Sequence, residues 1–243
     1  AGPLGVIGSS SANALAAEAD VVLAVGTRLQ DFTTGSWSVF GNEQMRLISL
    51  NAARYDAHKH RALSVVGDAL VGIEELGQAL DDWKGPEVWA SQAKSLYGEW
   101  NRTVDEHSGP TDTVPPSYAH VVGAINRVCD ETDLALTAAG GFPGELCKNW
   151  KTKAVGTFHC EFGFSCMGYE IAGGWGAKMA DPARDVIVLV GDGSYLMMNS
   201  DIYSSVLTGH KLIVVVCDNG GFGVINRLQN FKGSASFNNL IAD

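Results

Sequence analysis

The chain has 243 residues, 46% of them hydrophobic, which is enough to bury the cores of one or two domains. Its formal net charge of −10 repels phosphate backbones and anionic headgroups, and no run of Lys and Arg interrupts this field. Apolar runs such as residues 186–190 are far shorter than the roughly 20 residues that span a bilayer. We therefore expect neither nucleic acid nor a membrane as a partner. The five scattered cysteines show no metal-binding spacing and predict reduced thiols in the cytoplasm.

Residues 1–85 predict a Rossmann-like domain with a parallel sheet. Apolar spacing indicates helices at residues 11–19 and 69–83, and buried strands at residues 20–26 and 46–51. Strands that alternate with helices are typical of βα units around such a sheet. The first residues carry neither an initiator Met nor a signal peptide, so we expect this domain to be truncated at its N-terminus.

A break at Lys84-Gly85-Pro86 ends this first domain. Residues 86–116 predict a linker, made of a polar helix and a loop rich in Pro, Thr and Ser. Residues 117–243 predict a second α/β domain that is truncated at its C-terminus. Its expected elements are a helix at 117–129, strands at 134–138, 185–190 and 211–217, and a helix capped by Asn199 that ends at Gly209. The predicted fold class is α/β, with two Rossmann-like parallel-sheet domains.

Two glycine-rich loops follow the last two predicted strands. Gly191-Asp192-Gly193-Ser194 leaves the first strand, and Asp218-Asn219-Gly220-Gly221 leaves the second. Because a right-handed βαβ crossover makes the two strands parallel, both loops should lie at the same edge of the sheet. One carboxylate, one amide oxygen and one main-chain carbonyl then provide three hard oxygen ligands, which suit Mg²⁺. The glycines let backbone N–H groups approach a diphosphate near the start of a helix.

These paired loops, with Asn219 27 positions after Asp192, resemble the cofactor-binding signature of thiamine diphosphate-dependent enzymes. The resemblance implies that Asp192, Asn219 and the main-chain carbonyl of Gly221 hold Mg²⁺. Position 218 departs from the family pattern, because Asp stands where Asn is usual, but that position is not a usual metal ligand. The cofactor contacts implied by the resemblance are Gly140, Gly141, Met167, Gly191, Asp192, Gly193, Ser194, Asn219, Gly221, Phe222 and Gly223.

Other segments extend the resemblance over nearly the whole chain. The run from Gly163 to Glu170 is similar to the family segment in which a large apolar residue supports the bent cofactor, a role that falls to Met167. The run from Ala139 to Phe142 is similar to a turn that touches the diphosphate. The first half, with Gly5-Val6-Ile7-Gly8 and residues 19–28, is similar to the family's central domain, which we expect to be a scaffold.

Within the family, residues 139–150, 158–175 and 217–229 are most similar to the ring-opening hydrolases of inositol breakdown. This similarity implies thiamine diphosphate- and Mg²⁺-dependent hydrolysis of a trihydroxycyclohexane-1,2-dione, a small-molecule substrate, to 5-deoxy-glucuronate. The family's activating Glu lies in a separate domain, so we expect no catalytic side chain in this chain and little activity from it alone. The whole protein is expected to be a homodimer or homotetramer.

Alternatives remain at this point. The chain could belong to an acetolactate synthase-like carboligase or a 2-keto acid decarboxylase, or it could be a non-catalytic nucleotide-binding α/β module. Taken alone, Asp192 would be a turn residue and Met167 ordinary core packing. A lone His159 would be a structural residue rather than a substrate contact. The paired loops favour the cofactor site over these simpler interpretations.

Overall fold

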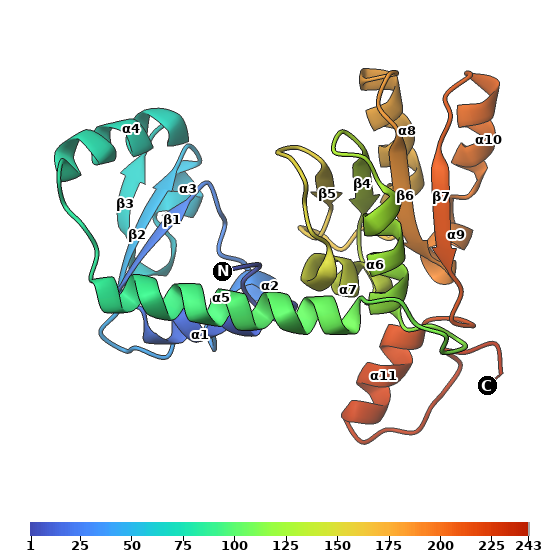
Figure 1. Ribbon diagram of the computed structural model, residues 1–243, viewed down its shortest axis with the longest axis horizontal. Coiled ribbons are helices and arrows are strands. Elements are labelled where there is room, and N and C mark those ends of the chain that lie inside the picture. Colours follow the sequence, from blue (N-terminus) through green and yellow to red (C-terminus); the bar gives the residue numbers. More distant parts are fainter. Residues whose placement is uncertain (243) are drawn as a thin grey trace. The chain divides into compact units, whose positions relative to one another are not determined.

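The computed structural model describes residues 1–242 and contains two compact units, Ala1–Asp105 and Glu106–Asp243. Each unit contains a parallel β-sheet with flanking helices (Figure 1), which confirms the predicted α/β class. The domain boundaries expected at residues 85 and 116 stay predictions. Within residues 1–242, no helix combines the length and the apolar character that crossing a membrane would require.

The first unit is built around three parallel strands in the order β1-β2-β3. Its elements are α1 (Ser10–Glu18), β1 (Val21–Val25), α2 (Asp31–Thr34), β2 (Arg46–Asn51), α3 (Arg54–Ala57), the 3-10 helix η1 (Lys59–Arg61), β3 (Leu63–Val66), α4 (Ala69–Leu80) and α5 (Glu87–His107). Strand β3 was not predicted, because four residues are too few to establish a period.

Helix α4 packs only loosely on this unit. Asp68 caps it by accepting hydrogen bonds from the backbone N–H groups of Leu70 and Val71. It ends at Leu80, three residues before the predicted end, because Asp81 leaves helical geometry (φ 43°, ψ −118°). None of its residues is buried, and Leu70 remains 66% exposed. The core of this unit is correspondingly small and centres on Ala24, Leu29 and Leu47.

The second unit is built around a four-stranded parallel sheet in the order β5-β4-β6-β7. Its elements are α6 (Tyr118–Val128), β4 (Leu134–Thr137), α7 (Gly141–Asn149), β5 (Phe158–Cys160), α8 (Tyr169–Ala180), β6 (Val186–Gly191), α9 (Asp192–Met198), α10 (Ser200–Leu207), β7 (Ile213–Cys217) and α11 (Gly223–Phe231). Figure 1 shows β6 and β7 side by side, with α11 beyond their carboxyl ends.

Both faces of this sheet are covered, so the unit has three layers. On one face, Ile187 and Leu189 pack with Val122 of α6 and Leu146 of α7. On the other face, Val188 packs with side chains of α8 and α10. Since strands buried on both faces need apolar side chains at every position, β6 is a continuous run of Val, Ile and Leu.

Several elements differ from their predictions. Helix α7 was not predicted because its sequence contains two Gly and one Pro, yet it forms because Phe142 and Leu146, four residues apart, bury one face. Strand β5 and helices α9 and α11 were also not predicted. Asn199 precedes α10 but makes no side-chain cap, because α9 runs into it in helical geometry (φ −65°, ψ −19°).

Two glycines of α8 give a matched test of this packing. A Cβ at Gly174 would lie 2.4 Å from Cγ2 of the buried Val188, whereas a Cβ at Gly176 would meet nothing within 4 Å. Ala is the better helix former at both positions. We expect Gly176→Ala to raise the free energy of unfolding by about 0.5–1 kcal/mol. We expect Gly174→Ala to lower it by about 1–3 kcal/mol because the core is overpacked. Denaturant titration measures both, and equal effects would contradict this packing.

Candidate metal and diphosphate site

The candidate site lies where the chain reverses its direction across the second sheet. From β4 the chain moves to β5 at one edge, then returns past β4 to β6 and β7. Ligands of open parallel sheets bind outside the carboxyl ends of the strands at such a switch point. Here the switch lies between β4 and β6, whose neighbouring backbones are further tied by the buried hydroxyl of Thr137, which donates to the carbonyl of Leu189 (2.8 Å).

Asp192 is the first residue after β6 and the first residue of α9. The register pairs Gly191 with Cys217, so the loop after β7 begins directly beside it. The backbone N–H of Gly221 donates to Oδ2 of Asp192 at 2.7 Å. This bond fixes the carboxylate between the two loops and leaves its other oxygen, Oδ1, turned toward Asn219.

The side-chain amide of Asn219 lies beside the Asp192 carboxylate and the Gly221 carbonyl. One terminal atom of this amide lies 2.5 Å from the hydroxyl of Tyr118, and the other faces two oxygens. These are the carbonyl oxygen of Gly221, at 2.6 Å, and Oδ1 of Asp192, at 3.2 Å. Without a metal, the amide nitrogen is the atom that can donate hydrogen bonds to both. With the amide oxygen in that place, three oxygens would converge and would need a cation among them. Octahedral Mg²⁺, with bonds of about 2.05 Å, spaces adjacent oxygens about 2.9 Å apart, so these residues fit the ion.

The loop after β7 owes its shape to two glycines with positive φ. Gly220 (φ 78°) donates its N–H to Oδ1 of Asp218. The Asp218 side chain thus closes a turn, and this oxygen faces the backbone. Gly221 has φ 139°, and a Cβ there would lie 2.4 Å from the carbonyl oxygen of Asn239. The segment around Leu240 pairs with this loop and supports it from behind. A larger residue than Gly could not present the Gly221 carbonyl in this way.

Phe222 and Gly223 complete the loop. The ring of Phe222 lies against Gly193, where a Cβ would approach its Cε1 to 2.9 Å, and the terminal methyl of Met167 is 3.7 Å from the same point. A Cβ at Gly223 would lie 2.9 Å from Nδ2 of Asn219. The structure therefore places Met167 beside the Asp192 loop. Because Gly193 and Gly223 have no side chains, Phe222 and Asn219 can lie against them.

Two family models match this chain. Residues 1–76 match the family model of the thiamine pyrophosphate enzyme central domain. Residues 138–240 match that of the thiamine pyrophosphate enzyme C-terminal TPP binding domain. The chain belongs to the thiamine pyrophosphate enzyme family. Thiamine pyrophosphate is another name for thiamine diphosphate, so the predicted family is confirmed.

Individual relatives carry a common name. Proteins named 3D-(3,5/4)-trihydroxycyclohexane-1,2-dione hydrolase from Geobacillus thermodenitrificans, Bacillus anthracis and Clostridium tetani are 37%, 36% and 35% identical to this chain. Each alignment covers 97% of this chain but 40% of the relative. The chain thus spans about two fifths of the length of the relatives that it matches.

A buried carboxyl group joins two segments of this thiamine pyrophosphate enzyme chain that contain predicted cofactor contacts. Glu170, in the first turn of α8, is fully buried. The hydroxyl of Ser194 donates to Glu170 at 2.9 Å, and the N–H of Gly168 donates to Oε2 of Glu170 and to Oγ of Ser194, both at 2.8 Å. Gly168 follows Met167 directly, so Glu170 ties the Met167 segment to the loop after β6.

The loop after β4 contributes the remaining predicted contacts. Gly140 has φ 131° and precedes α7. A Cβ at Gly141 would lie 2.7 Å from Nη2 of Arg227 and 3.6 Å from the ring of Tyr118. Because Gly141 has no side chain, the guanidinium of Arg227 in α11 can lie against it. No role was predicted for Tyr118, Glu170 or Arg227 from the sequence, although Glu170 and Arg227 lie in stretches that carry the family resemblance.

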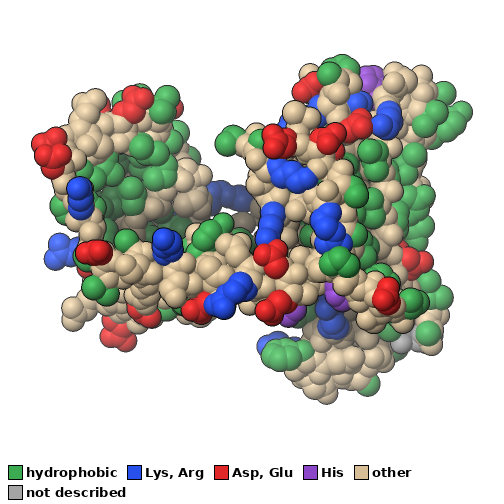
Figure 2. Space-filling model, in the orientation of Figure 1, with side chains coloured by type: hydrophobic (Ala, Val, Ile, Leu, Met, Phe, Trp, Pro, Cys, Tyr) green, Lys and Arg blue, Asp and Glu red, His purple; other side chains and the backbone are tan. Residues whose placement is uncertain are grey.

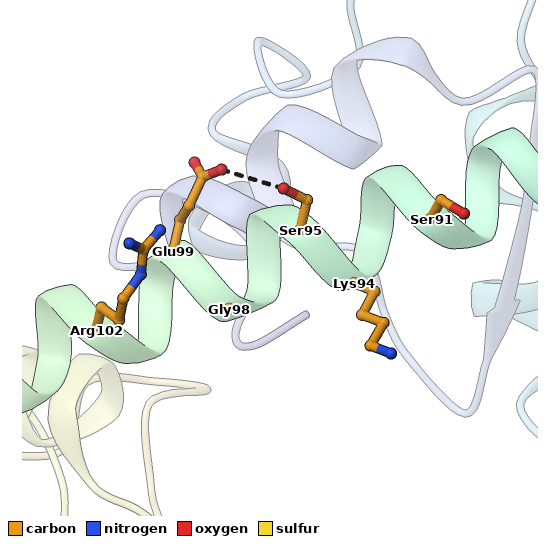
Figure 3. Close-up of a pocket in the computed structure, with 6 residues that line it drawn as sticks. All are labelled: Ser91, Lys94, Ser95, Gly98, Glu99 and Arg102. Carbon is orange, nitrogen blue, oxygen red and sulfur yellow. Dashed lines mark hydrogen bonds between the residues drawn. The ribbon is translucent and has the colours of Figure 1, made fainter.

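Two surface hollows lie away from these loops. One, of about 500 Å³, is lined by His159 and Tyr169 among other residues, and the Tyr169 hydroxyl lies 2.9 Å from Nε2 of His159. This pairing agrees with a structural role for His159. The other, of about 550 Å³, is lined by α5 alone, where Ser95 donates to Glu99 at 3.2 Å (Figure 3). None of the predicted site residues lines either hollow.

Glu170 also gives a prediction for pH. Burial raises the pKa of Glu170 above its ordinary value of 4.5, although hydrogen bonds from Ser194 and Gly168 favour the carboxylate. The folded state therefore binds this proton more tightly than the unfolded state does. This contribution to stability is full below pH 4.5 and is lost as the pH rises through the raised pKa.

We expect Glu170→Gln, which cannot ionise and can still accept from Gly168, to remove that loss. The free energy of unfolding of the variant, relative to the unchanged protein, should increase as the pH rises from 5 toward 8. Urea titration at several pH values measures this difference, with Glu131→Gln at an exposed position as the control. Curves that stay parallel across the pH range would show that Glu170 is not held as proposed.

Proposed function

We propose that this chain forms the diphosphate and Mg²⁺ half of a thiamine diphosphate site in a hydrolase that cleaves a carbon–carbon bond. The observation that carries the proposal is the convergence of the Asp192 carboxylate, the Asn219 amide and the Gly221 carbonyl at the edge of the second sheet. Membership of the thiamine pyrophosphate enzyme family supports the cofactor. The relatives named trihydroxycyclohexane-1,2-dione hydrolase support the reaction class.

The metal is the part of the proposal that follows from charge. A diphosphate brings roughly two to three negative charges to a loop that already contains Asp192. Unit charges 4 Å apart interact by about 4 kcal/mol at an effective dielectric of 20, so a divalent cation is needed between them. Asp192, Asn219 and the carbonyl of Gly221 would hold it, and diphosphate and water would complete the octahedron.

The remaining residues of the proposed site orient the cofactor. Gly191 and Gly193 leave the backbone accessible beside the start of α9, and Met167 stands at Gly193 as an apolar support. Gly140 and Gly141 would approach the diphosphate from the loop after β4, with the cationic Arg227 nearby. When bound, thiamine diphosphate supplies a nucleophilic carbon that adds to a carbonyl and accepts the electrons of the breaking bond.

The proposed substrate is a trihydroxycyclohexane-1,2-dione. Hydrolysis breaks the bond between the two carbonyl carbons. Water supplies the oxygen that turns one of these carbons into a carboxylate, and the other carbon becomes an aldehyde, which gives 5-deoxy-glucuronate. The step is balanced without an external oxidant, because one carbon is oxidised while the other is reduced. It would belong to inositol degradation in the cytoplasm.

A homo-oligomeric whole protein is also proposed. Apolar side chains of α10 are exposed at the surface of the second unit (Figure 2), including Tyr203, Val206 and Leu207, each at least 67% exposed. Contiguous exposed apolar surface is normally covered by another domain or chain. Light scattering of the whole protein at micromolar concentration tests this proposal, and a lone monomer would contradict it.

The metal site predicts how two neighbouring aspartates differ. Asp192→Asn removes the only charged ligand, so in the whole protein we expect at least tenfold weaker thiamine diphosphate binding, or about 1.4 kcal/mol. Asp218→Asn is the matched control, since an Asn oxygen can still accept from Gly220 and close the same turn. Calorimetry with Mg²⁺ and with EDTA measures both variants. Metal-independent binding, or a larger loss from Asp218→Asn, would place the site elsewhere.

The reaction predicts its own product. The whole protein, supplied with the dione, thiamine diphosphate and Mg²⁺, should release one open-chain product that carries both a carboxylate and an aldehyde, with no carbon dioxide. Product analysis by NMR measures this outcome. Evolution of carbon dioxide from a 2-keto acid would indicate a decarboxylase, and a branched hydroxy-keto acid a carboligase. Either result without ring opening would contradict the proposed hydrolysis.

A further inference from the structure

Tyr118 reaches the proposed metal site from far away in sequence. It is the first residue of α6 and lies 101 positions before Asn219, whose Nδ2 is 2.5 Å from its hydroxyl. Its ring packs against Phe142 of α7, with ring centroids 5.4 Å apart, and lies beside Gly141. Ser117 caps the helix in front of it by accepting from the N–H of His120. The ring is thus fixed by packing, and the hydroxyl has one defined direction.

The amide that this hydroxyl holds can be satisfied in two ways. With Nδ2 toward Tyr118, Oδ1 faces the oxygens of Asp192 and Gly221 and needs a cation among them. With the amide turned over, Nδ2 donates to the Gly221 carbonyl at 2.6 Å and to Oδ1 of Asp192 at 3.2 Å. In that second state Oδ1 accepts from the Tyr118 hydroxyl at 2.5 Å. The amide nitrogen then faces Asp192 and Gly221 in the position that the amide oxygen could occupy only with a cation beside it.

A tyrosine hydroxyl suits both states because it donates and accepts. It accepts from Nδ2 in the first state and donates to Oδ1 in the second. Neither a Lys, which only donates, nor a carboxylate, which only accepts, could do both. The hydroxyl therefore keeps the Asn219 side chain aimed at Asp192 and Gly221 whichever way the amide faces.

We propose that Tyr118 is a positioning residue for the metal, and that Tyr118 with Asn219 forms a reversible amide latch. Without a cation the latch closes, and the Asn219 nitrogen bonds Asp192 and Gly221. Binding of Mg²⁺ turns the amide over, and the Tyr118 hydroxyl changes from donor to acceptor. The inference rests on the proposed function, because it takes Asp192, Asn219 and Gly221 as the metal ligands.

The latch gives position 219 a specific reason to be Asn. A carboxylate there would offer an oxygen to the metal without turning over, yet without the metal it would face Asp192 as a second negative charge. The neutral amide avoids that repulsion by presenting its nitrogen. Partners that orient a ligand commonly contribute tenfold to hundredfold to metal affinity. Because Asn219 is exposed and water can replace the hydroxyl, we expect the low end of that range.

The test uses the whole protein and Mg²⁺ titration by calorimetry in the presence of thiamine diphosphate. Tyr118→Phe keeps the ring against Phe142 and removes only the hydroxyl. We expect it to weaken Mg²⁺ binding about tenfold with an unchanged melting temperature. Tyr97→Phe, on α5 of the first unit, is the control and should change nothing.

A double-mutant cycle separates the latch from simple packing. In an Asn219→Asp background no amide has to turn, so we expect adding Tyr118→Phe to cause a smaller loss of Mg²⁺ affinity than it causes with Asn219. An unchanged affinity in Tyr118→Phe alone, or an equal loss in both backgrounds, would overturn the latch. Asp192→Asn separates a failure of the proposed metal site from a failure of the latch. If it leaves Mg²⁺ binding intact, the metal site itself is wrong. If it abolishes binding while Tyr118→Phe has no effect, only the latch is wrong.

Discussion

The register between β6 and β7 is the constraint on which the candidate site depends. Since the two strands are parallel and Gly191 pairs with Cys217, the residues that follow them emerge side by side at one edge. A shift of one residue would turn the side chains of β7 to the opposite face of the sheet, where Ile213 and Val215 now pack against one core and Val214 against the other. The apolar cores therefore hold Asp192 and Asn219 opposite each other. Packing energy sets where the two loops meet, and the hydrogen bond from Gly221 to Asp192 then fixes the carboxylate between them.

Converging oxygens are unfavourable by themselves, and the surrounding donors show how the protein tolerates them. The N–H of Gly221 neutralises one oxygen of Asp192, and the Asn219 amide can present its nitrogen to the other. Behind these loops, Glu170 and Ser194 use the N–H of Gly168 to connect the Met167 segment. The site is thus satisfied without a cation, and turning the Asn219 amide over would make three oxygens available to one. This preorganisation limits how much the chain must rearrange when a ligand enters.

The sequence revealed the parts of the fold and site that local pattern controls. Continuous apolar runs predicted β6 and β7, and the glycine-rich loops after them predicted Asp192 and Asn219 at one edge. Helix α7 was missed because its Gly and Pro residues suppress propensity, while the burial of Phe142 and Leu146 outweighs it. Tyr118 was missed because its partner Asn219 is distant in sequence, and Glu170 because its partner Ser194 is. A Tyr at the start of a helix and a Glu in a first turn both look like ordinary surface residues until the tertiary contacts bring them together.

Position 218 shows how a family signature can vary without loss of geometry. The usual Asn and the Asp found here both place an acceptor where the N–H of Gly220 can reach it, so the turn that presents Asn219 and Gly221 forms with either. The difference lies in charge. Asp218 is exposed, so water and salt screen its charge over a distance of about 8–10 Å. What remains of its field opposes a diphosphate and favours a cation. The substitution therefore preserves the shape of the loop while making an anionic ligand depend more strongly on the metal beside it.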